Sequence, residues 1–297
     1  MPLYVEPTAG SAPITSFIRA ATAPVDVEVY YLASRPVIQA IQAARERGVI
    51  VRVIVDGRPY RLPHRLIETE IRRLRAAGAD VRVSPPRFDA AFRFDHAKYA
   101  VSGGHVLIGT ANWDYSAFHR NREYLLTSDD PALARALGAV FKADWTHTPV
   151  GDVARREAPR LVLSPGAEPR LAAIIDQPGS IVFEGEELGD DPALIEALAR
   201  KGHDARVLLP AAQSARDRMN IATLRRAGVA VRRLPRQPLY LHAKMIVGAR
   251  FGFIGSENVS RASLDANREV GVVIIRPAQL TVLRQTFARD WAASTKG

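Results

Sequence analysis

The chain has 297 residues, of which 47% are hydrophobic and 24% charged, an ordinary composition for a globular protein long enough for two domains of about 150 residues. The absence of cysteine excludes disulfides, thiol catalysis and thiolate metal sites. Its 41 basic and 31 acidic residues give a net charge of +10, which favours anionic partners such as nucleic acid or an acidic membrane surface.

The first half of the chain begins with alternating strand and helix patterns. Residues 25–56 predict a strand, a helix and a second strand, with Ser34 before the helix, Pro36 in its first turn and Gly48 at its end. A second predicted helix ends at Gly78 and is followed by another strand. Strands that alternate with helices predict a mostly parallel or mixed sheet with helices on both faces.

Residues 94–112 read as two strands joined by a glycine turn. His96 and Lys98 lie two apart on the first strand, and Thr110 and Asn112 lie two apart at the end of the second. Residues i and i+2 of a strand point to the same face, so each pair projects together. The four side chains offer a nucleophile or proton carrier, a cation and hydrogen-bonding groups for an anion.

The second half of the chain repeats the first. His96 recurs as His242, and seven further residue types keep the same offset of 146 positions. The repeated residues are His96, Lys98, Gly109, Asn112, Asn121, Glu123, Phe141, Asp144 and Trp145, which return as His242, Lys244, Gly255, Asn258, Asn267, Glu269, Phe287, Asp290 and Trp291. Ser256 takes the place of Thr110. A period of this length indicates a duplicated domain whose copies share one site on a pseudo-twofold axis.

The duplication sets the predicted domain organisation. We expect a first α/β/α domain over residues 1–150, a linker rich in proline and arginine over 151–170, and a second α/β/α domain over 171–297. Residues 180–210 repeat the strand, helix and strand of the first half, with Asp191 before the helix. Each domain should be a mixed sheet flanked by helices.

Two simpler explanations of the repeated histidines fare badly. A lysine on the same face opposes a bound cation, and no cysteine or cluster of aspartates accompanies the pair, so we expect no metal site. A purely structural repeat leaves eight polar groups at strand ends unexplained. The pattern HxK, followed by GTxN or GSxN, a downstream NRE and a closing FxxDW, occurs twice. It resembles the phospholipase D superfamily over essentially the whole chain.

The resemblance implies two α/β/α domains side by side, with both histidine segments at their interface and no cofactor. It implies cleavage or exchange of a phosphodiester, independent of metal, through a covalent phosphohistidine. By analogy with relatives that carry two motifs, we expect His96 to be the nucleophile and His242 the proton carrier. The other expected catalytic residues are Lys98, Lys244, Asn112 and Asn258, which neutralise the phosphate, and Glu123 and Glu269, each expected to orient the histidine of the opposite half.

The sequence departs from the family pattern at one repeated position. HxKxxxxD would place an aspartate at 103 and 249, where this chain has Gly103 and Ala249. In the family that residue is held to be structural support and not a reacting group. The departure leaves a weakly catalytic, phosphate-binding protein as one open alternative.

The substrate stays open between phospholipid, which we place first, and nucleic acid. Thr110 and Ser256 are candidate substrate-binding hydroxyls. Phe88 and Phe92, interleaved with arginines in residues 84–94, are candidate contacts for a membrane surface or for stacked bases. Both half-sites lie in one chain, so we expect a monomer.

The N-terminus lacks a basic start followed by an apolar run, and no apolar stretch approaches the roughly 18 residues of a membrane span. We therefore expect a cytoplasmic protein without a transmembrane segment. Peripheral contact with an anionic membrane stays open.

Overall fold

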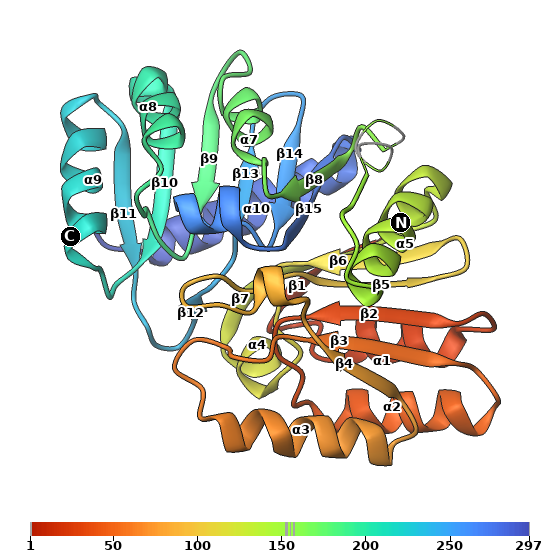
Figure 1. Cartoon of the computed structure of the whole chain (residues 1–297). Coiled ribbons are helices and arrows are strands. Elements are labelled where there is room, and N and C mark those ends of the chain that lie inside the picture. Colours follow the sequence, from red (N-terminus) through yellow and green to blue (C-terminus); the bar gives the residue numbers. More distant parts are fainter. Residues whose placement is uncertain (1, 152–153, 155, 157, 297) are drawn as a thin grey trace.

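The computed structural model describes every residue except 1, 152–153, 155, 157 and 297, so part of the predicted linker lies outside the described residues. Two α/β/α units lie side by side, and each is a mixed sheet between layers of helices (Figure 1). This confirms the predicted fold of two tandem domains.

The first sheet has the strand order β1-β7-β6-β5-β2-β3-β4. Strands β2, β3 and β4 are parallel, and the remaining neighbours along this order are antiparallel. The bounds are β1 Leu3–Glu6, β2 Val25–Val29, β3 Val51–Val55, β4 Asp80–Val83, β5 Lys98–Ser102, β6 His105–Gly109 and β7 Asn121–Ser128. A strand of the second half, β12 (Tyr240–Leu241), pairs in parallel with β7, so the sheet of one unit is extended by the other.

The second sheet repeats this order strand for strand, as β8-β15-β14-β13-β9-β10-β11. Its bounds are β8 Leu161–Ser164, β9 Ile181–Glu184, β10 Ala205–Pro210, β11 Ala230–Leu234, β13 Met245–Val247, β14 Gly252–Gly255 and β15 Glu269–Ile274. Strand β8 occupies the place that β1 has in the first sheet and pairs with β15. The predicted linker over 151–170 is therefore too long, because its second half already belongs to the second unit.

Helices cover both faces of each sheet. The first unit has α1 Ala12–Ala20, α2 Arg35–Glu46, α3 His64–Ala76, α4 Tyr115–His119 and α5 Pro131–Trp145, and the second has α7 Glu168–Ile175, α8 Pro192–Lys201, α9 Ala215–Arg226 and α10 Pro277–Ala293. Asp191 caps α8 by accepting a hydrogen bond from the Leu194 amide, whereas Ser34 precedes α2 without a side-chain capping bond. No helix of the described chain is both long and apolar enough to cross a bilayer.

One hydrophobic core is shared by the two units. It contains side chains of α5 and α10 together with the sheet faces that these helices cover. Phe141 stacks on Trp145 and Phe287 on Trp291, with ring centroids 5.5 Å and 5.4 Å apart, so the aromatic residues of the repeated FxxDW segment serve packing. The shared core holds the two sheets in a fixed relation, which a site between them requires.

Candidate active site

The two HxK segments have the same local structure at the start of equivalent strands. Lys98 opens β5, and its ammonium donates a hydrogen bond to the His96 carbonyl at 2.5 Å. Lys244 precedes β13 and donates to the His242 carbonyl at 2.7 Å. Both lysines are buried, so their charges act in a medium where water screens them weakly.

Each imidazole is held by a carboxylate of the opposite unit. His96 Nδ1 lies 2.8 Å from Glu269 Oε2 in a hydrogen bond, and His242 Nδ1 lies 2.6 Å from Glu123 Oε1 at ion-pair distance without hydrogen-bond alignment. Both carboxylates are fully buried. Because Nδ1 is occupied in each ring, Nε2 is the nitrogen left for chemistry.

The two orienting carboxylates are held in turn by neutral polar side chains. Asn267 and Ser263 donate to Glu269 Oε1 at 3.0 Å and 2.8 Å. Thr110 donates to Glu123 Oε2 at 2.6 Å, and Asn121 reaches Oε1 at 3.3 Å. These donors fix the rotamers of the carboxylates and thereby the planes of the imidazoles.

Thr110 and Ser256 do not serve as substrate hydroxyls, and this corrects the sequence prediction. Both are fully buried. The Thr110 hydroxyl is committed to Glu123, and the Ser256 hydroxyl donates to the Val270 carbonyl and accepts from the Val270 amide. A small hydroxyl at these positions can form hydrogen bonds within the sheet. The sequence pattern does not distinguish such a hydroxyl from one that points into a cleft.

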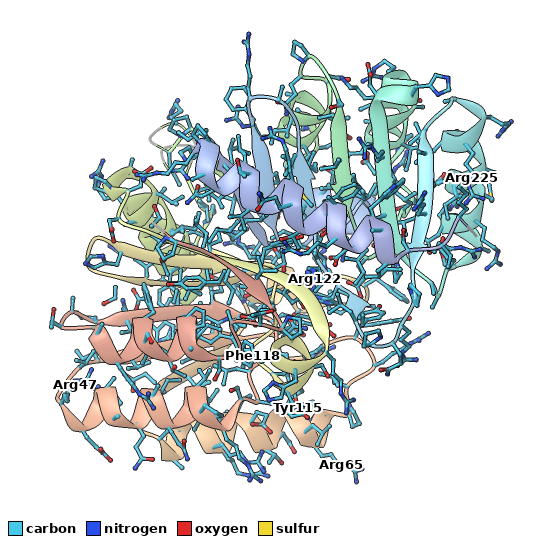
Figure 2. The ribbon with its side chains drawn as sticks, turned by 180° about the vertical axis from the view of Figure 1, so that it is seen from behind. Arg47, Arg65, Tyr115, Phe118, Arg122 and Arg225 are labelled. Atoms are coloured by element: carbon cyan, nitrogen blue, oxygen red, sulfur yellow. The ribbon has the colours of Figure 1, made fainter. Side chains whose placement is uncertain are left out.

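The arginine of each repeated NRE segment also crosses between the units. Arg122 Nε lies 2.5 Å from Asp290 Oδ2, and Arg268 Nε lies 2.7 Å from Asp144 Oδ2, each pair with a second, parallel contact. Figure 2 shows Arg122 at the junction of the two units. These arginines therefore clamp the interface. Each arginine is paired with the aspartate of the FxxDW segment in the opposite unit, a pairing that the sequence pattern did not reveal.

The two asparagines keep their carboxamides uncommitted. Among the described residues, the Oδ1 atoms of Asn112 and Asn258 are buried without a hydrogen-bond partner. Asn258 lines a small cavity together with Lys244. Their predicted contact with a phosphate stays a prediction.

The two candidate aromatic contacts separate in the structure. Phe92 is 74% exposed, but Phe88 is only 3% exposed. The guanidinium groups of Arg87 and Arg268 both lie over the Phe88 ring, 4.8 Å and 4.6 Å from its centroid. The prediction that Phe88 contacts substrate is therefore wrong, because the ring packs under the arginine clamp.

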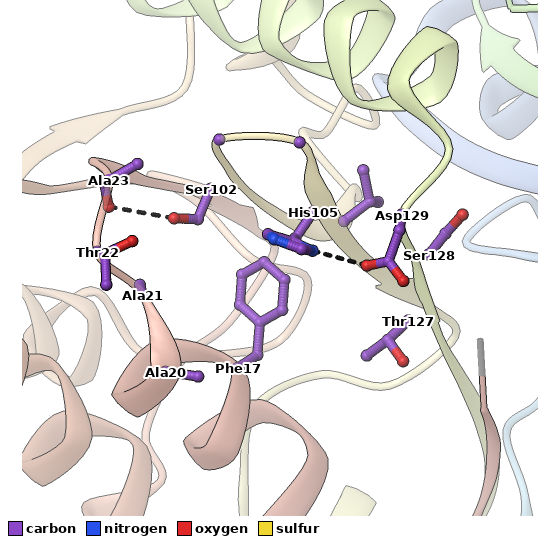
Figure 3. Close-up of a pocket in the computed structure, with 13 residues that line it drawn as sticks. Phe17, Ala20, Ala21, Thr22, Ala23, Ser102, His105, Thr127, Ser128 and Asp129 are labelled. Carbon is purple, nitrogen blue, oxygen red and sulfur yellow. Dashed lines mark hydrogen bonds and ion pairs between the residues drawn. The ribbon is translucent and has the colours of Figure 1, made fainter.

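Both positions that lack the family aspartate lie in hairpin turns, at the far end of the strands from the histidines. Gly103 has a φ of +57°, a left-handed conformation that suits a tight turn. Beside it lies a surface pocket of about 300 Å³ with the exposed His105–Asp129 ion pair at its rim (Figure 3). Near Ala249, the Gln177 carboxamide oxygen accepts the backbone amides of Arg250 and Phe251, so other contacts hold this turn.

Two residues that the sequence analysis missed face the imidazoles. The missed residues are Tyr30 and Glu186, and the strand register shows that they are equivalent. Tyr99 and Met245 occupy the same place in the repeat, and they pair with Glu28 on β2 and with Glu184 on β9. Two residues further along, the first half has Tyr30 and the second half has Glu186. An acidic residue after a strand is usual for a solvated loop, so the sequence alone gave no reason to select Glu186.

Burial dominates the electrostatics of the first half-site. It lowers the pKa of His96 to about 4, with Lys98 and Lys244 adding to the effect and Glu269 opposing it. Burial likewise lowers the pKa of Lys98 to about 7. Burial alone would raise the pKa of Glu186, but the charges of His242 and Lys244 outweigh it and hold this carboxyl well below its usual range. The lysines and both imidazoles thus act on one another across a single site.

The site combines two imidazoles, each with a carboxylate at Nδ1, with two buried lysines. Within the described part of the chain, no group of three or more His, Asp or Glu side chains is arranged to hold a metal ion. Ammonium groups stabilise the non-bridging oxygens of a phosphate, and neighbouring imidazoles can serve as nucleophile and proton carrier. The arrangement is suited to phosphoryl transfer.

Comparison with known proteins agrees with this chemistry. A family model described as "Cardiolipin synthase, PLD-like domain" matches residues 14–145 and 182–291, one segment in each unit. The mitochondrial cardiolipin hydrolase of Xenopus laevis is 32% identical over 118 residues, which cover 39% of this chain and 52% of that protein. The chain thus spans about half the length of the curated relatives it matches.

Two solved structures share the fold over nearly the whole chain. Phosphatidylserine synthase from Haemophilus influenzae superposes with a TM-score of 0.70 at 13% identity, covering 99% of this chain and 87% of that one. Polyphosphate kinase from Porphyromonas gingivalis gives a TM-score of 0.72 at 15% identity, covering 98% of this chain and 50% of that one. At this identity the likeness concerns the fold alone.

Proposed function

The chain belongs to the phospholipase D superfamily, and we propose that it is a metal-independent phosphodiesterase that hydrolyses or transfers the phosphatidyl group of a phospholipid through a phosphohistidine. The single observation that carries this proposal is the crossed contact of each imidazole with a carboxylate of the opposite unit. It leaves Nε2 of each ring as the nitrogen for chemistry, and a buried lysine lies two residues from each histidine.

The reaction proceeds in two steps at this site. One imidazole attacks phosphorus while the other gives a proton to the departing oxygen. Lys98 and Lys244 neutralise the charge that the phosphorus oxygens carry in the transition state. In the second step the imidazole that lost its proton takes one from water or an alcohol, which then attacks phosphorus and releases the first histidine.

Phospholipid is the proposed substrate class because the matching family model and the curated relatives are both described by cardiolipin. The exposed Phe92 beside Arg93 supports contact with an anionic lipid surface. Nucleic acid is the second candidate, favoured by the net charge of +10.

The direct test incubates purified protein with EDTA and three labelled substrates in parallel, namely phosphatidylcholine vesicles, phosphatidylglycerol vesicles containing cardiolipin, and single-stranded DNA. We expect release of the lipid headgroup at a rate that EDTA leaves unchanged. Acid quench during turnover should trap phosphorus on a histidine. Cleavage of DNA alone would replace the proposed substrate, and a strict need for a divalent ion would contradict the mechanism.

Histidine variants supply the matched control. His96→Ala and His242→Ala should each lower turnover by at least ~10²–10⁴-fold, and the double variant should lose little more because the two residues act as one unit. His105 lies on the same hairpin as His96 but is exposed, so His105→Ala should keep full activity. Substantial activity in either site variant would contradict a shared site.

A further inference from the structure

The two imidazoles have different neighbours at Nε2, the reacting nitrogen. His242 Nε2 lies 3.4 Å from Glu186 Oε2, and the same oxygen accepts a hydrogen bond from Lys244 at 2.9 Å. The Glu186 side chain is 29% exposed, so it lies between the buried site and solvent. With Glu123 at Nδ1, both ring nitrogens of His242 face a carboxylate oxygen, so an N–H on either nitrogen has an acceptor beside it.

The equivalent place in the first half holds an aromatic ring. Tyr30 packs edge-on against His96 with centroids 4.6 Å apart, and its hydroxyl accepts the Tyr60 amide at 2.5 Å. The Lys98 ammonium lies 5.1 Å from the Tyr30 centroid. Within the described part of the chain, the carboxylate in contact with a His96 ring nitrogen is Glu269 at Nδ1, and the neutral Tyr30 ring and nearby cations complete an environment that favours a free lone pair on Nε2.

A further carboxylate strengthens the contrast. Burial raises the pKa of Asp114. The Ala117 amide and the charge of His242 each lower that pKa again in part. Asp114 caps α4 by accepting from the Ala117 amide, and the repeat replaces it with Ser260 in the second half. Glu123 and Glu186 thus lie beside the two ring nitrogens of His242, whereas the described carboxylate in contact with a ring nitrogen of His96 is Glu269 at Nδ1.

We propose that Glu186 and Tyr30 are positioning residues that divide the chemistry between the histidines. Glu186 keeps a proton on His242 Nε2 and makes this residue the general acid, while Tyr30 keeps the Nε2 lone pair of His96 free and makes that residue the nucleophile. This assignment rests on the proposed phosphodiesterase function and deepens it. The exchange of Tyr30 for Glu186 is the difference between the halves that lies directly beside the two rings.

The assigned steps balance in atoms and electrons. The His96 Nε2 lone pair forms a bond to phosphorus, the bond from phosphorus to the leaving oxygen breaks, and that oxygen takes the proton of His242 Nε2. Water or an alcohol then gives a proton to His242, its oxygen attacks phosphorus, and the P–N bond electrons return to His96. Glu186 again faces a doubly protonated ring, ready for the next turnover.

The test compares two esters that differ in their need for a proton. Phosphatidyl p-nitrophenol releases a stable phenolate without help, whereas phosphatidylglycerol releases an alkoxide that must be protonated; if DNA is the substrate, thymidine esters of p-nitrophenol and of an alkyl alcohol replace them. We expect Glu186→Gln to lower kcat/KM by ~10–10²-fold for the alkyl ester and by at most about threefold for the nitrophenyl ester. An equal loss on both esters would show that Glu186 acts only through Lys244 and would overturn the proposal.

Further variants test each side of the assignment. His242→Ala should still transfer phosphorus from the nitrophenyl ester to His96 and accumulate the phosphohistidine, whereas His96→Ala should form none. Tyr30→Glu should slow both esters and Tyr30→Phe neither, because only the former places a carboxylate beside the nucleophile. Glu196→Gln removes the same charge from the exposed side of α8 and should change nothing. Phosphorus trapped on His242 overturns the assignment, and no turnover of any ester by the native protein overturns the proposed function with it.

Discussion

The two halves of the molecule share a backbone plan but differ in the charges that surround each histidine. Strand order, the lysine hydrogen bonds and the crossed contacts of histidine and arginine recur in both. In contrast, the first half places the buried acids Asp56 and Asp95 where the second has Pro210 and Leu241, and the second half places Glu186 where the first has Tyr30. The framework that positions the groups is therefore common to both halves, while charged residues around the histidines differ between them.

The crossed carboxylates offer the largest test of this comparison. Glu269→Gln and Glu123→Gln should each reduce kcat on an alkyl phosphodiester on the order of 10²–10⁴-fold, because the amide no longer fixes the tautomer of the imidazole in the opposite half. Initial rates of headgroup release measure both losses. Asp129→Asn is the control, since Asp129 makes a similar contact to His105 at the exposed surface. Near-native activity in one variant would mean that its half does not contribute.

The arginine clamps differ in burial and should differ in stability. Arg268 and Asp144 are 3% and 0% exposed, against 10% and 6% for Arg122 and Asp290. Breaking a buried pair costs about 3–5 kcal/mol, so Arg268→Met should lower the free energy of unfolding by about this amount and Arg122→Met by less. Urea denaturation followed by circular dichroism gives both values. Equal or negligible losses would show that burial does not set the strength of the clamps.

The exposed aromatic of residues 84–94 has no counterpart in the second half and should matter for binding alone. Phe92→Ser should leave the free energy of unfolding within about 0.5 kcal/mol, because the ring is exposed. Binding to anionic vesicles, measured by sedimentation, should weaken by about 1.5–3 kcal/mol if the ring enters the lipid surface. A loss of about 1–3 kcal/mol in binding to single-stranded DNA, with vesicles unaffected, would favour base stacking instead. A lowered melting temperature would mean that Phe92 packs against the protein.

The smallest expected effect concerns the titration of Lys98. Its pKa is lowered to about 7 by burial, so the ammonium loses its proton as the pH rises through that value and the free site loses a positive charge. The inhibition constant of dimethyl phosphate, an anion that does not titrate near neutrality, should therefore rise about tenfold between pH of about 6 and about 8.5. Lys98→Arg should flatten this dependence, because guanidinium stays charged. A flat profile in the native protein would contradict the titration of Lys98.

The sequence predicted the features that repetition makes visible. A shared offset of 146 positions marked His96, Lys98, Glu123 and their partners, and the alternation of strand and helix predicted the two mixed sheets. It could not separate hydroxyls that face a cleft from hydroxyls that bond within a sheet, which is why Thr110 and Ser256 were misjudged. Burial of Phe88 depends on Arg268 from the other unit, a contact between residues far apart in the chain.

Asymmetry was the least predictable property of the site. A search for repeated residues cannot find Glu186, because the equivalent position in the first half holds a different residue, Tyr30. Its significance depends on the strand pairings that make it equivalent to Tyr30 and on a distance of 3.4 Å to His242. Only the three-dimensional register relates the two positions.

The crossed contacts also determine when the site can first work during synthesis. A nascent chain that has not reached residue 269 lacks the carboxylate that orients His96, and one that has not reached residue 290 lacks the partner of Arg122. The first unit can therefore leave the ribosome with its histidine present but unoriented. Truncated translation products and proteolytic fragments that contain one unit lack the carboxylate that orients their histidine, so we expect them to be inactive unless two copies dimerise.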